Sequence, residues 1–111
     1  MQLVSQTEVE RVLRNWQAGA LTEVQVHEWA ELRYAVDAYE PESAACNAVL
    51  AELDCMNMNL LTTADIPVLL EALPLNSPEF ENILSGLDNS ATIESRRRAL
   101  RTHPFYAQFC G

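Results

Sequence analysis

The side chains best suited to bind a metal or transfer a proton fall in one predicted helix. Glu23, His27 and Glu31 recur every four residues, so they form one stripe along that helix, with Tyr34 close by. A histidine between two carboxylates can ligate a transition metal or act as a general base. We favour a solvated helix face instead, because metal sites in helical bundles normally draw ligands from facing helices. No metal or cofactor is therefore expected.

Acidic side chains dominate the chain. Sixteen Asp and Glu residues face seven basic residues, all arginine, for a formal net charge of −9 over 111 residues. This charge disfavours nucleic acid and anionic membranes, and it suits either a basic partner protein or solubility alone. If a partner is bound, we expect its docking surface to comprise Glu23, Glu28, Glu31, Asp37, Glu40 and Glu42.

Positive charge gathers near the C-terminal end. The basic patch consists of Arg96, Arg97, Arg98 and Arg101. With Ile93 at the centre of the apolar helix face, Arg97 should turn inward and need an acidic partner, while Glu94 pairs with Arg98. We favour a basic helix docked onto an acidic bundle. The alternatives are a nucleic-acid or phosphate-binding adaptor, and a homodimer that joins this basic tail to the acidic body of another copy.

Nothing in the sequence favours an enzyme. Phosphate loops and the common hydrolase and metalloprotease motifs are missing. Three cysteines cannot close a complete disulfide framework; Cys46 and Cys55 fall on opposite faces of one predicted helix, and Cys110 lacks a nearby base. Without an early apolar run or a bilayer-length apolar stretch, we expect a cytoplasmic protein. Arginine in place of lysine suggests a GC-rich bacterial genome.

Helix-start motifs divide the chain into short helices. Ser5 with Glu8, and Thr22 with Gln25, have capping-box spacing, and Gly19 separates the two helices that they start. These signals predict a helical hairpin over 6–39. A central helix over 43–57 and helices over 63–73, 78–87 and 92–102 should follow. No segment alternates with the period of a β-strand. The prediction is an all-α fold, a compact bundle of five to six short helices in a single domain over 1–111.

Two further expectations concern the later helices. Ser77 should cap the helix that begins at Pro78. The aromatic turn at 104–109, with Phe105, Tyr106 and Phe109, should fold back onto the bundle and not form an exposed anchor.

The opening layout resembles a known class of proteins. An amphipathic helix, the segment Gly19-Ala20-Leu21-Thr22, a second helix and strong acidity are similar to small helical immunity proteins of bacterial toxins, over about a third of the chain. The resemblance implies an inhibitor whose partner is a basic toxin domain.

The leading hypothesis is a small acidic, non-enzymatic module that binds a basic protein. The alternatives are a metal-binding or catalytic helical protein built on Glu23, His27 and Glu31, and an adaptor that binds phosphate or nucleic acid through Arg96–Arg101.

Overall fold

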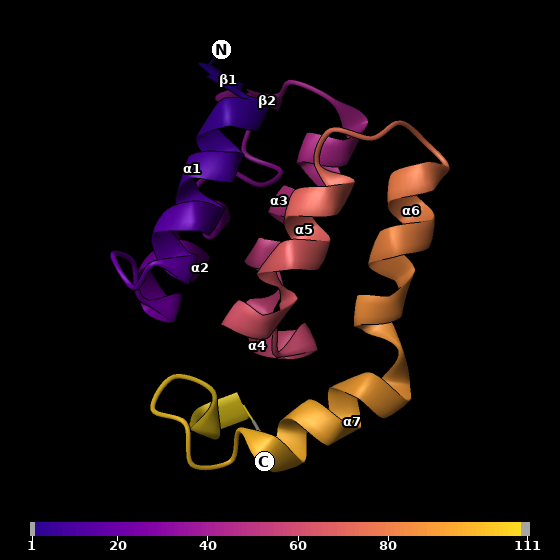
Figure 1. Cartoon of the computed structure of the whole chain (residues 1–111). Coiled ribbons are helices and arrows are strands. Elements are labelled where there is room, and N and C mark those ends of the chain that lie inside the picture. The colour runs from indigo at the N-terminus through magenta and orange to yellow at the C-terminus, as the bar shows by residue number, and fades with distance from the viewer. Residues whose placement is uncertain (1, 110–111) are drawn as a thin grey trace.

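The predicted all-α fold is confirmed. The computed structural model describes residues 2–109, and within that range it contains seven α-helices in one body of 38 × 27 × 26 Å (Figure 1). The helices are α1 (Gln6–Gln17), α2 (Glu23–Glu31), α3 (Ala44–Asp54), α4 (Met56–Asn59), α5 (Ile66–Ala72), α6 (Glu79–Leu84) and α7 (Ser90–Ala99). Short 3-10 turns are η1 (Thr63–Asp65), η2 (Ser85–Asp88) and η3 (Ala107–Phe109). None of the helices in this range is both long enough and apolar enough to span a bilayer.

The first two helices start where the capping residues predict. Ser5 Oγ accepts the Glu8 N–H at 3.1 Å, and Thr22 and Gln25 exchange both hydrogen bonds of a capping box. Gly19, with φ of 82°, turns the chain between them. The apolar face of α1 is buried in the core, and its buried residues are Val9, Val12, Leu13 and Trp16.

The predicted helix through Tyr39 is wrong in its second half, because α2 ends at Glu31. The chain then turns through Ala35, whose φ of 57° lies in the left-handed region. Tyr39–Pro41 forms a short strand, β2, that pairs in parallel with β1 (Gln2–Val4), so the expectation of no strand also fails. The periodicity of this segment cannot reveal the pairing, because its partner lies at the other end of the hairpin.

The predicted central helix divides into two. α3 packs against α1, α2 and α5, and it buries Cys46, Val49, Leu50 and Leu53 completely. The helix breaks at Cys55, and α4 adds one turn before Leu60 takes a left-handed conformation with φ of 57°.

The later helices differ from prediction mainly at their starts. The Ser77 hydroxyl does not cap α6; it donates to the Glu81 carboxylate at 3.0 Å, and α6 begins at Glu79. Asn89 caps α7, which therefore begins at Ser90 and not at Thr92. Figure 1 shows α7 crossing the lower end of the bundle.

The tail after α7 folds back as predicted. Phe105 and Tyr106 are buried, and Phe109 packs partly buried against the core. Phe105 contacts both other rings edge to face. Cys110 lies outside the described residues.

Candidate functional site

Five of the six predicted docking acids are exposed, and four of these lie on the stretch 28–40. Glu28 and Glu31 belong to α2, and Asp37 and Glu40 follow in the connection to β2 and in β2 itself. The other two acids serve the fold. Glu42 accepts the Gln6 N–H at the start of α1, and Glu23 lies half-buried beside His103. We use "acidic surface" for the four acids Glu28, Glu31, Asp37 and Glu40.

A groove opens beside the acidic surface. It has a volume of about 440 Å³, and its lining residues are Ala35, Val36, Asp37, Tyr39, Glu40 and Pro41. Two large apolar side chains near it are solvent-exposed, Leu32 just before the turn and Leu3 on β1, which pairs with Glu40 across the sheet. Exposed apolar patches rimmed by polar residues are typical of surfaces that bind other proteins.

Arg33 braces the chain that forms this groove. Its guanidinium lies 4.9 Å from the ring centroid of Trp29 and 5.3 Å from that of Tyr39. It also donates to the Trp29 carbonyl at 3.1 Å, and its Nε lies 3.6 Å from Glu8 Oε1. These contacts tie the end of α2 to β2 and to α1. The sequence analysis missed this role, because it predicted that the hairpin of helices continues to residue 39, past Arg33.

The structure does not bring Glu23, His27 and Glu31 together as one site. His27 Nε2 lies 3.0 Å from the Asp54 carbonyl and 3.9 Å from Glu31 Oε2, whereas Glu23 turns to His103 at 3.5 Å. Among the described residues, no three His, Cys, Asp or Glu side chains gather in a way that could hold a metal ion.

Both histidines contribute to docking of the tail. His27 contacts the Phe105 ring, with 6.0 Å between the two centroids. His103 Nδ1 accepts the Phe105 N–H, and its Nε2 faces Glu23. Both ring nitrogens of His103 thus face partners within the folded chain.

The predicted inward arginine is Arg96 and not Arg97. Arg96 is 12% exposed and pairs with Asp65 at 2.8 Å, whereas Arg97 is 39% exposed and pairs with Glu94 on the same helix. The two arginines follow Ile93 by three and four residues, so they flank it at about 60° and 40°. The sequence cannot show on which flank the acidic partner lies. The predicted pair of Glu94 with Arg98 is replaced by the Glu94–Arg97 pair.

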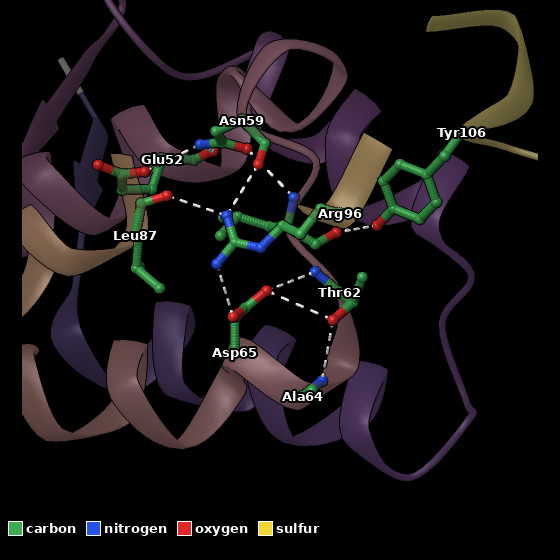
Figure 2. Close-up of polar contacts among 9 residues, drawn as sticks. Glu52, Asn59, Thr62, Ala64, Asp65, Leu87, Arg96 and Tyr106 are labelled. Carbon is green, nitrogen blue, oxygen red and sulfur yellow. Dashed lines mark hydrogen bonds and ion pairs between the residues drawn. The ribbon is translucent and has the colours of Figure 1, made fainter. Parts of the chain in front are cut away.

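Arg96 is the centre of a buried polar network, which Figure 2 shows. Its Nη1 donates to the carbonyls of Asn59 and Leu87, both at 2.9 Å. Asn59 in turn donates to Glu52, while Asp65 accepts the Thr62 N–H. Arg96 is engaged here and Arg97 pairs with Glu94, so within residues 2–109 only Arg98 and Arg101 of the predicted basic patch have no ion-pair partner.

No protein-family model matches this chain, no curated protein matches its sequence, and no solved structure matches its fold. The similarity of its opening layout to immunity proteins stays a prediction.

Proposed function

We propose that this protein is a small acidic, non-enzymatic module that binds a basic protein. The observation that carries the proposal is the distribution of charge between ion pairs within the chain and exposed acids. Four of the seven arginines are paired with carboxylates of the same chain, in the pairs Arg14–Glu10, Arg33–Glu8, Arg96–Asp65 and Arg97–Glu94. The acidic surface keeps its negative charge exposed, so the molecule presents a more one-sided field than its composition suggests.

Such a field favours association with a positively charged partner. Exposed like charges raise the rate of encounter with a basic protein and fix its orientation, and this effect weakens as salt is added. The exposed Leu3, Leu32 and Val36 supply apolar area that can be buried once the partner has docked. The partner class therefore follows from charge, and the resemblance to immunity proteins makes a basic toxin domain one candidate.

The proposal is tested by immobilising this protein, capturing its partner from a lysate of the source organism at low salt, and eluting with a salt gradient. The test variant is Glu28→Gln/Asp37→Asn/Glu40→Gln, and the matched control is Glu71→Gln/Glu79→Gln/Glu81→Gln, which removes equal charge from other exposed positions. We expect one basic protein to be retained stoichiometrically by the wild type and the control, and to leave the test variant at clearly lower salt. Equal weakening in both variants, or no retained protein, would contradict the proposal.

Phosphate or nucleic-acid binding has less support. Only Arg98 and Arg101 of the basic patch have no ion-pair partner within residues 2–109, and two phosphate contacts give a salt slope of only about −1.8. Such binding would be weak and would disappear in Arg98→Ala/Arg101→Ala. The same two arginines are those that a homodimer would have to place against the acidic surface.

A further inference from the structure

We infer that the groove between the end of α2 and β2 is a docking site for a protein segment in which an aliphatic side chain is flanked by Lys or Arg. The groove is the one lined by Ala35, Val36, Asp37, Tyr39, Glu40 and Pro41. The inference rests on the proposed function, and it adds the place of docking and the chemistry of the docked segment.

Apolar groups in the groove select the aliphatic part of the segment. Val36 is 37% exposed, and Tyr39 and Pro41 are only half-buried. An aliphatic side chain placed against Val36 and Pro41 would remove apolar surface from water on both partners.

The negative charge of the groove favours Lys or Arg next to the aliphatic side chain of the docked segment. Asp37 and Glu40 are exposed on the groove, and neither has a hydrogen-bond or ion-pair partner within residues 2–109. The nearest arginine in sequence, Arg33, is held by Trp29 and Tyr39 and does not neutralise them. Two uncompensated carboxylates beside apolar groups fit a segment with cationic side chains and repel an acidic one.

The groove is organised before any partner arrives. The Arg33 guanidinium stacks on the ring of Tyr39, which lines the groove, and β2 is held by its pairing with β1. A preformed site avoids the ordering cost that flexible loops incur on binding. Pro41 has no N–H, and Tyr39 N already donates to Val36 O at 2.9 Å, so neither can donate to an added strand. Recognition here therefore uses side chains and not strand addition.

Titration of the ¹⁵N-labelled full chain with synthetic peptides tests this inference. The probe is a short peptide of alternating Lys and Leu, and the control peptide alternates Lys and Ser, with equal charge. We expect the Lys–Leu peptide to shift the backbone amides of residues 35–40 and to bind about tenfold more tightly than the Lys–Ser peptide, since one buried aliphatic side chain contributes about that factor.

Matched variants locate the two contributions. Val36→Ser should weaken binding of the Lys–Leu peptide several-fold, while Val24→Ser, at a 54% exposed valine on α2, should leave binding unchanged. Asp37→Asn/Glu40→Gln should weaken binding of both peptides, while Glu71→Gln/Glu79→Gln should not. The amide spectrum of each variant shows whether its fold is intact.

Three outcomes would overturn the inference: shifts that map elsewhere, equal affinity for the two peptides, or no binding. If a basic protein is still captured through the acidic surface while the peptides leave the groove unperturbed, the proposed function stands and the docking site is wrong. If the peptides bind the groove but no basic protein depends on the acidic surface, the groove stands and the proposed function fails.

Discussion

At the scale of single residues, the fold strongly changes the acidity of the Tyr106 hydroxyl. Its side chain is fully buried, and its hydroxyl donates a hydrogen bond to the Leu61 carbonyl. Burial raises the pKa of this phenol well above its ordinary value, and nearby Glu23 and Asp65 raise it further. Burial likewise raises the pKa of the Cys46 thiol, which donates to the Val4 carbonyl at 3.2 Å. Both groups hold their protons more tightly in the folded chain.

These shifts predict a loss of stability at alkaline pH. The unfolded chain releases the Tyr106 proton near pH 10, whereas the folded chain retains it, so stability is full below that pH and falls as pH rises. Urea unfolding of the wild type should show this fall from about pH 9.5 upward.

The substitution Tyr106→Phe isolates the contribution of this phenol to the pH dependence of stability. It should cost about 1 kcal/mol at pH 8, because the Leu61 carbonyl loses its donor, and it should flatten the alkaline fall. Some slope should remain from Cys46, whose shift has the same sign. Tyr34→Phe is the control and should keep the full fall. An equal alkaline slope in wild type and Tyr106→Phe would show that folding does not raise the pKa of this phenol.

At the scale of elements, Arg96 joins α7 to the rest of the bundle. Its three partners come from different elements: Asn59 ends α4, Leu87 lies in η2, and Asp65 ends η1. Carbonyls at helix ends have no hydrogen-bond donor within their own helix. The single Arg96 guanidinium donates to two such carbonyls and to one carboxylate. The short α7 thereby gains a fixed place across the bundle.

Removing this charge should be costly. Arg96→Gln cannot reach all three partners, and it leaves the Asp65 carboxylate, 15% exposed, without its cation. We expect a loss of about 2–4 kcal/mol in the free energy of unfolding, measured with urea. The neighbouring Arg98→Gln, at an exposed position, should change stability by less than about 0.5 kcal/mol. Similar effects of the two substitutions would mean that the network does not anchor α7.

At the scale of the whole molecule, net charge opposes compactness. Folding brings sixteen acids into a small volume with only seven arginines, and four of those arginines are paired. The paired arginines offset local repulsion, while the exposed acids still repel one another at low ionic strength. The feature that suits a basic partner therefore costs stability in the unbound protein.

Added salt should stabilise the unbound protein. Raising NaCl from about 10 mM to about 200 mM shortens the screening length and weakens the repulsion. We expect the Tm to rise by roughly 4 °C, equivalent to about 1 kcal/mol, in a calorimetric or circular-dichroism melt. Glu71→Gln/Glu79→Gln/Glu81→Gln should show a smaller rise, since it carries less negative charge. A Tm that falls with salt would mean that the intrachain ion pairs outweigh the repulsion.

Short-range signals in the sequence predicted those features of the helices that depend on residues close together in the chain. The caps at Ser5 and Thr22 and the apolar face of α1 were predictable, because a cap or a helix face involves residues only three or four positions apart. The excess of acid, and hence the class of partner that we propose, also follows from composition alone.

Tertiary structure decided what depends on residues far apart in the chain. The strand at Tyr39–Pro41 exists because Gln2–Val4 lies beside it, and Arg96 turns inward because Asp65 lies on its flank of α7. Two of the predicted docking acids also meet residues distant in sequence: Glu23 faces His103, and Glu42 accepts the Gln6 N–H. Helical periodicity specifies which face of a helix is apolar, but it carries no information about which neighbour that face will meet.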